Sequence, residues 1–155
     1  MLFRSCFEDS DITHVEGKIA PLADIETIET ELMLADLDSL EKRVDNLSKK
    51  SKGNDKDAKE QLDHVNRTLV LLREGKPARL VERKAEEERA FSMLGLLSSK
   101  PVLYVCNVEE GSAKDGNNFS KAVFERAREE GAVAVVISAK IESEIATLSR
   151  EERVD

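Results

Sequence analysis

The chain has 155 residues, enough for one ordinary domain or two small units. Charged residues make up 36% and aromatic residues 4%, with no tryptophan, which is typical of long charge-bearing helices. The net charge of −8 argues against a surface that coats nucleic acid uniformly, but it allows a local basic patch. Cys6 and Cys106 lie in no metal-ligand pattern, and two lone thiols without a signal-like start favour a reduced, cytoplasmic setting. No apolar run approaches the ~20 residues needed to cross a membrane.

Residues 1–20 are expected to hold a strand remnant at Cys6 and Phe7, followed by a polar turn. His14 lies in this turn without partner residues around it, so we interpret it as an ordinary loop histidine. The chain begins almost at once with a short apolar fragment and stops within a helical pattern that lacks a stop signal. We therefore expect it to be a piece of a larger protein.

Two long helical patterns follow. Pro21 suits a helix start, a first pattern runs from Asp24 to about Lys50, and the SKGND turn separates it from a second. Apolar residues in both recur in steps of four and three, the seam of a coiled coil. These residues are Met33, Leu37, Leu40, Val44 and Leu47, then Ala58, Leu62, Val65, Leu69 and Leu72. Two seams flanking one short turn predict an antiparallel coiled-coil hairpin over residues 21–75.

The remaining residues, 76–155, predict an α/β unit. A third amphipathic helix is expected over residues 81–99, then a strand from Val102, a helix over 119–130, a strand over 132–139 and a last helix. The second strand, AVAVVISA, is continuously apolar, which predicts burial on both faces and hence a parallel sheet. We expect inward-facing side chains on the third helix at Phe91, Leu94 and Leu97, and on the next helix at Phe119, Val123, Phe124 and Ala127.

Polar residues follow both of these strands, in CNVEE at 106–110 and SAKIE at 138–142. Ligands of parallel α/β sheets bind beyond the carboxyl ends of strands, so both segments would border one crevice. An Asn amide matches the N6 and N7 atoms of adenine, and a fixed carboxylate accepts the N1 and N2 donors of guanine. The pattern thus allows purine recognition by Asn107, with an ordinary cap or turn asparagine as the alternative.

Three stretches of the sequence together resemble the YchF family, the Obg-like ATPases among the translation-factor P-loop NTPases. They are RSCFEDSDITHVEGKIAPLADIETIETELMLADLDSLEKR, KPVLYVCNVEE and GAVAVVISAKIESEIATLSREER. The resemblance covers residues 6–155. It implies a partial P-loop NTPase (G-domain) parallel sheet with the helical hairpin inserted in it, so that residues 1–20 and 76–155 belong to the nucleotide-binding domain.

The resemblance also implies roles for individual residues. Ordinary GTPases read guanine with Asn-Lys-x-Asp, whereas this family has Asn-x-x-Glu and binds ATP at least as well as GTP. Asn107 would contact the base edge, Val108 would flank the base, and Glu110 stands where guanine-selective proteins have Asp. The family's second base loop corresponds to Ser138, Ala139 and Lys140, with Glu142 ordering that loop.

Two departures from the family pattern bear on activity. The phosphate-binding loop GxxxxGK[ST] occurs nowhere in the 155 residues, and neither do the switch segments that would hold Mg²⁺ and the attacking water. In the family these lie upstream, and a small C-terminal (TGS) domain lies downstream. The parent protein is expected to hydrolyse ATP or GTP with Mg²⁺, whereas this chain alone is expected to be inactive, with no catalytic residue and no metal ligand. Ala20 also stands where the family usually has Asp.

A basic cluster surrounds the predicted hairpin turn. Residues 42–59 hold seven bases and three acids, a net charge of +4 within a chain of −8. Lys49, Lys50, Lys52 and Lys56 are the candidate contacts to phosphates of the ribosome or rRNA, and a solvated coiled-coil end is the alternative. A second function therefore stays open: a non-enzymatic coiled-coil module that binds ribosome or RNA through this basic tip.

Overall fold

The computed structural model describes residues 2–6, 20–53 and 55–148. It divides into two compact units, residues 1–25 with 102–155, and residues 26–101. The second unit takes in residues 76–101 in addition to most of the predicted hairpin. Phe7 and His14 lie outside the described residues, as does the end of the last predicted helix.

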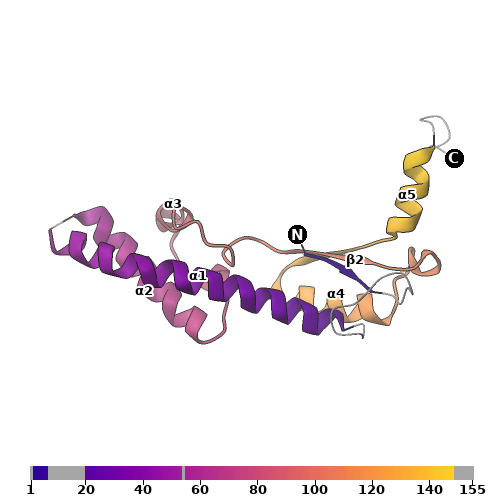
Figure 1. Ribbon diagram of the computed structural model, residues 1–155, viewed down its shortest axis with the longest axis horizontal. Coiled ribbons are helices and arrows are strands. Elements are labelled where there is room, and N and C mark those ends of the chain that lie inside the picture. Colours follow the sequence, from indigo (N-terminus) through magenta and orange to yellow (C-terminus); the bar gives the residue numbers. More distant parts are fainter. Residues whose placement is uncertain (1, 7–19, 54, 149–155) are drawn as a thin grey trace. The chain divides into compact units, whose positions relative to one another are not determined.

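The first unit is built on a three-stranded parallel sheet (Figure 1). Its strands are β1 (Leu2–Ser5), β2 (Leu103–Asn107) and β3 (Val133–Ile137), in the order β1-β2-β3. The parallel α/β arrangement expected from the sequence is confirmed. The first strand differs in detail, because it ends at Ser5, and Cys6 follows it with its backbone N–H donated to the Asn107 carbonyl at 2.7 Å.

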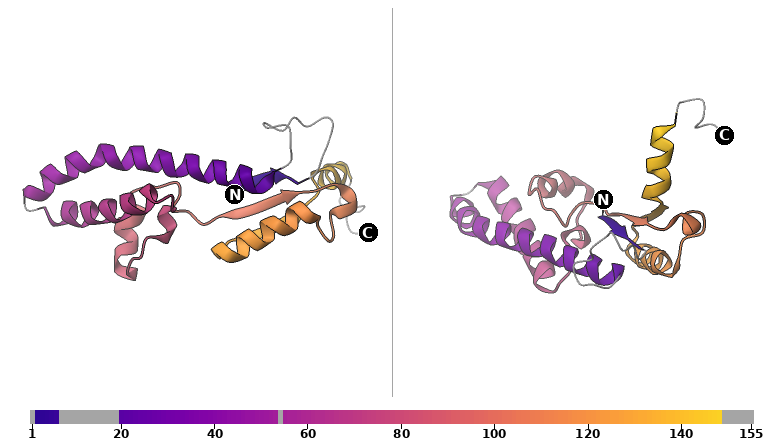
Figure 2. Two further views of the ribbon diagram at one scale, coloured as in Figure 1. Left: turned by 90° about the horizontal axis from the view of Figure 1, so that it is seen from below. Right: turned by 45° about the vertical axis from the view of Figure 1, so that its right-hand side comes forward.

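Helix α4 (Asn118–Glu130) covers one face of this sheet and runs alongside β2 (Figure 2). Val123 and Ala127 are buried in one apolar cluster with Tyr104 and Cys106 of β2. The helix ends as predicted at Gly131, whose φ of 66° places it in the left-handed region that glycine tolerates best. The next amide, that of Ala132, then bonds back to the Ala127 carbonyl at 2.8 Å.

Two inward-facing residues predicted on α4 are exposed. Phe119 and Phe124 are each 40% exposed, whereas Ser120, Val123 and Ala127 are buried. The buried stripe is centred on these three positions because a helix turns by 3.6 residues, and the two phenylalanines flank it on either side. The prediction for Phe119 and Phe124 was therefore wrong, and that for Val123 and Ala127 is confirmed.

Burial of the β3 strand on both faces is also not observed. Val133 is 60% exposed and Val135 is 37% exposed. Within the described residues α4 covers one face of the sheet, and α5 (Ala139–Thr147) has no buried residue. A continuous apolar run indicates a strand that can be buried on both faces of a sheet. Whether the second face is covered depends on other elements packing against it.

The second unit is helical. It holds most of α1 (Pro21–Lys52) and all of α2 (Lys56–Arg73), which lie side by side (Figures 1 and 2). The Asp55 side chain caps α2 by accepting the Ala58 amide at 3.1 Å, as the turn sequence suggests. Eight of the ten predicted seam residues pack in one cluster, in which Leu40, Val65, Leu69 and Leu72 are buried and Met33, Leu37, Val44 and Leu47 are partly buried.

The third helix predicted over residues 81–99 is not formed as one element. The structure has two 3₁₀ turns, Ala78–Leu80 and Ala85–Glu87, and then the five-residue α3 (Glu88–Ser92). The Glu87 carboxylate accepts the Lys84 amide at 2.7 Å, and Gly95, beyond the end of α3, adopts a left-handed φ of 67° that a continuing helix would not allow. Phe91 and Leu94 are buried as predicted, but Leu97 is 42% exposed.

A buried carboxylate organises the segment that follows α3. Asp36 of α1 is 3% exposed and accepts three hydrogen bonds, from the Leu97 amide at 2.7 Å, the Ser98 amide at 2.8 Å and the Ser98 hydroxyl at 2.6 Å. The Ser98 hydroxyl in turn accepts the Ala78 amide at 3.1 Å. Asp36 thus connects α1 to two irregular segments, each of which needs partners for its backbone groups.

Candidate functional site

The two predicted base loops are joined by the Asn107 side chain. Asn107 ends β2, and its partner in the ladder is Ile137, the last residue of β3. Its Oδ1 atom accepts the backbone N–H of Ala139 at 2.8 Å, and the residue is 6% exposed. Because that bond fixes which end of the amide is oxygen, the Nδ2 group is left as the donor. The structure therefore brings together the loops that the sequence placed at one sheet edge.

Val108 anchors the first loop from below. Its side chain is 1% exposed within the core of the unit, and its backbone N–H donates to the Ile137 carbonyl at 2.9 Å. A side chain held in this way positions the residues that follow it.

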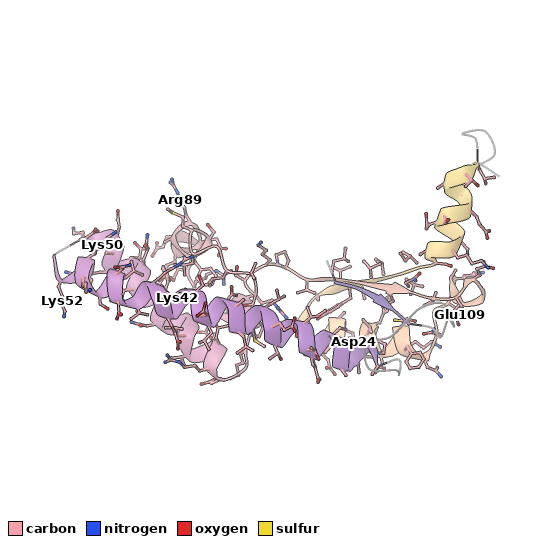
Figure 3. All side chains as sticks on the ribbon, in the orientation of Figure 1. Asp24, Lys42, Lys50, Lys52, Arg89 and Glu109 are labelled. Carbon is pink, nitrogen blue, oxygen red and sulfur yellow. The ribbon has the colours of Figure 1, made fainter. Side chains whose placement is uncertain are left out.

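The first acid of the motif, Glu109, is held by two neighbours. The Ser112 hydroxyl donates to one carboxylate oxygen, and the Asn117 Nδ2 group donates to the other at 3.1 Å. These hydrogen bonds, with that from Ser112 the largest contribution, hold the pKa of the Glu109 carboxyl below its usual value. Glu109 lies in the loop after β2 (Figure 3).

Asn117 is a site residue that the sequence reasoning missed. Its Nδ2 group also donates to the Cys6 carbonyl at 2.6 Å, and its Oδ1 atom accepts the Ser120 amide at 3.0 Å as the N-cap of α4. One side chain therefore ties together the end of β1, the loop after β2 and the start of α4. An asparagine that precedes a helical pattern was the available signal, since this residue type is favoured at N-caps.

The second acid, Glu110, forms an ion pair with Lys140 across the two loops. The Lys140 Nζ atom lies 2.6 Å from Glu110 Oε1, and the two side chains are 72% and 44% exposed. Both residues are predicted base-loop residues, and spacing alone gave no indication that they would pair with each other. Glu142 donates its backbone N–H to the Ser138 carbonyl at 3.0 Å, which closes the first turn of α5.

Ser138 presents a buried polar atom at the same place. The residue is 4% exposed, and its hydroxyl has no hydrogen-bond partner within the part of the chain that the structure describes. Buried polar groups are nearly always paired, so an unpaired hydroxyl between two loops indicates a missing partner such as a ligand or water.

The two thiols lie beneath this loop pair. Cys6 and Cys106 are 0% and 1% exposed, and both belong to the same apolar cluster. Their mutual hydrogen bond, together with burial, raises the pKa of the Cys6 thiol above its ordinary value. Because Cys106 is buried in this cluster, we interpret it as a packed strand residue, since a reactive thiolate needs exposure and nearby positive charge.

The basic cluster lies around the turn between α1 and α2. Lys49, Lys50, Lys52 and Lys56 are exposed, and Figure 3 shows Lys50 and Lys52 beside this turn. Two other bases counted in the cluster have partners within the chain: Lys42 pairs with Asp38, and Arg43 bonds the Leu94 carbonyl. The four named lysines form no ion pair among the described residues, so their charge is available to a partner.

A second polar cluster, in the helical unit, was not anticipated. Ligand atoms of Asp63, His64 and Glu87 lie within 4.8 Å of one another, a spacing that a metal ion would fit. The Arg67 guanidinium contacts all three side chains, at 2.8, 2.8 and 3.0 Å respectively. A cation from the chain itself thus fills the cluster, and we assign no metal to it.

None of the helices in the described part of the chain combines the length and apolar character that crossing a membrane requires.

This fold and site are those of an α/β protein whose parallel strands end in two facing polar loops and whose chain also carries a helical unit. The sequence is 46% identical over 150 residues to the ribosome-binding ATPase YchF of Haemophilus influenzae, covering 97% of this chain and 41% of the relative. It is 45% identical over 149 residues to the protein of that name from Bacillus subtilis, covering 95% of this chain and 41% of the relative. No family model matches.

The comparison with solved structures gives the same resemblance. The YchF GTPase of Schizosaccharomyces pombe superimposes with a TM-score of 0.82 at 25% identity, over 98% of this chain and 43% of that one. The resemblance to the YchF family is therefore confirmed over the segment that the chain spans. That segment corresponds to about two fifths of the length of the curated relatives it matches.

Proposed function

We propose that this chain supplies the purine-recognition loops and the helical arm of a YchF-type ATPase or GTPase. The observation that carries the proposal is the Asn107–Ala139 hydrogen bond, which joins the two predicted base loops at one edge of a parallel sheet. The relatives named ribosome-binding ATPase, and the neighbour named GTPase, support nucleotide hydrolysis as the activity of the intact protein.

In this proposal each loop residue has a defined role. The Asn107 Nδ2 group contacts the base edge, the buried Ser138 hydroxyl finds its partner on the bound nucleotide, and Ala139 holds the Asn107 amide in place. Val108, whose side chain is in the core, supports the loop from beneath the base. Glu110 and Lys140 lie at the rim as an ion pair.

The phosphate half of the site lies outside these 155 residues in our proposal, since the sequence contains no GxxxxGK[ST] loop. Residues of that other half would hold the Mg²⁺ ion, which would supply neutralisation of the phosphate charge when bound. We therefore expect the purified chain to release no phosphate from ATP or GTP with Mg²⁺, in a colorimetric phosphate assay. Turnover that co-purifies with the chain and is abolished by Asn107→Ala would contradict this expectation.

A chimera tests the base-recognition role directly. This chain would replace the matching 150 residues of the Haemophilus influenzae relative, which would supply the remaining segments. Asn107→Ala should then weaken ATP binding about tenfold or more, because it removes a base contact and leaves the Ala139 amide without its acceptor. Fluorescent ATP titration measures the dissociation constant.

Asn66→Ala is the matched control for this experiment, since Asn66 is exposed on α2 in the other unit. It should leave the dissociation constant unchanged. An active chimera that binds ATP equally well with and without Asn107→Ala would remove the base-recognition role.

A second function rests on the basic tip. We interpret α1 and α2 as the antiparallel coiled-coil hairpin inserted in the nucleotide-binding domain, with residues 1–20 and 76–155 belonging to that domain. The exposed lysines at its turn favour contact with ribosomal RNA phosphates in the cytoplasm, and the relatives' names point to the ribosome as the partner. If the nucleotide role fails, this contact alone would make the chain a non-enzymatic ribosome- or RNA-binding module.

A further inference from the structure

Both acids that follow β2 are engaged by side chains of the chain itself. Glu109 is held by Ser112 and Asn117, on the side of α4. Glu110 is held by Lys140, which projects from the first turn of α5. Neither carboxylate therefore presents its oxygens unopposed to a base placed between the loops.

The pairing of these carboxylates affects which purine can bind, because adenine and guanine differ in their hydrogen-bonding groups. Adenine and guanine both present an N7 acceptor, so a donor from the Asn107 Nδ2 group would serve either base. Guanine differs by presenting an N1–H and N2–H donor pair, which a carboxylate accepts with both oxygens, whereas adenine has an acceptor at N1. Selection between the two bases thus depends on whether a carboxylate is available, and Glu110 occupies the position that would provide it.

We propose that Lys140 sets the purine preference of this site by holding the Glu110 carboxylate in an ion pair and so withholding it from guanine. This inference rests on the proposed base-recognition function and names the group that determines its selectivity. Asn107 binds either purine, and Lys140 removes the advantage that guanine would otherwise have.

The strength of the ion pair decides how large the effect is. The Nζ–Oε1 distance of 2.6 Å is short, but the two side chains are 72% and 44% exposed, and water weakens pairs of this kind. A guanine base therefore competes with Lys140 for Glu110 and is not excluded outright. We expect removal of Lys140 to change the preference about three- to tenfold, below the full discrimination of a buried bidentate contact.

The test uses AMP and GMP as probes on this 155-residue chain, because the inference concerns the base and not the phosphates. NMR titration at millimolar concentration would follow the Asn107 side-chain amide and the Ala139 backbone amide. Lys140→Ala should raise the ratio of GMP affinity to AMP affinity about three- to tenfold relative to the unaltered chain. Adding Glu110→Gln to Lys140→Ala should cancel that gain, since the amide no longer offers two acceptor oxygens.

Two controls separate the ion pair from net charge. Lys140→Arg keeps a cation beside Glu110 and should keep the original ratio. Lys121→Ala removes the same charge from an exposed position on α4 and should change nothing. If both amides respond to nucleotide but Lys140→Ala leaves the ratio unchanged, the selectivity role is wrong and the base site stands. If neither amide responds to either nucleotide in any variant, the base site itself is wrong, and the role of Lys140 falls with it.

Discussion

Replacement of Asp36 by alanine should lower the free energy of unfolding by about 3 kcal/mol or more. Asp36 is 3% exposed, and its carboxylate accepts the amides of Leu97 and Ser98 together with the Ser98 hydroxyl. Alanine would leave these donors without an acceptor in a place that water reaches poorly. Urea unfolding followed by circular dichroism at 222 nm measures the change, because most of the helical signal comes from the unit that contains Asp36.

Two variants make this result specific. Asp36→Asn retains one acceptor oxygen, so it should lose less stability than alanine but more than a surface change. Asp38→Ala, two residues along the same helix, removes an acid that pairs with the exposed Lys42, and it should cost less than about 0.5 kcal/mol. Equal losses for Asp36→Ala and Asp38→Ala would show that the buried carboxylate is not a principal support of the unit.

The helices of the arm could be predicted because their evidence is local. Apolar residues that recur in steps of four and three indicate one buried stripe along a helix. Leu40, Val65, Leu69 and Leu72 are buried in the structure as that pattern requires. The polar strand ends could also be predicted. Neighbouring parallel strands end at the same edge, and this places Asn107 next to the loop of Ala139.

The features that the sequence did not predict depend on contacts between residues far apart in the chain. The Asp36–Leu97 hydrogen bond spans 61 positions. The local sequence does not reveal that a side chain of one helix will accept a hydrogen bond from the backbone of a distant segment. The same competition explains why residues 81–99 do not form one helix despite a suitable apolar spacing. Backbone amides of this segment donate to carboxylates such as Glu87 and Asp36 instead of to carbonyls of a helical ladder.

Side-chain pairing at the site escaped prediction for a related reason. The motif placed Glu110 and Lys140 at the same edge, but whether two long side chains pair depends on their rotamers and not on spacing. Asn117 was within reach of sequence reasoning as a helix cap. Its additional bonds to Cys6 and Glu109, which make it a junction of three segments, required the fold.

If the basic tip contacts the ribosome as proposed, reversal of three of its charges should abolish most of that binding. The triple variant Lys49→Glu, Lys50→Glu and Lys52→Glu changes the tip by six charge units, and co-sedimentation with ribosomes should fall at least tenfold. Neutralisation of the same lysines to glutamine gives a finer measure. If all three contact phosphates, the slope of log affinity against log salt should decrease by about 2 to 3.

The alternative for these lysines is structural and makes a different prediction. All three lie in the last turn of α1, where positive charge stabilises the helix end by interacting with its dipole. A purely structural role would appear as a lower melting temperature with ribosome binding retained. A matched control, Lys76→Glu, Lys84→Glu and Lys100→Glu, changes the same number of charges on exposed residues of the same unit away from the turn. Equal loss of co-sedimentation in both triple variants would mean that ribosome binding follows net charge, and the tip would then not be the contact.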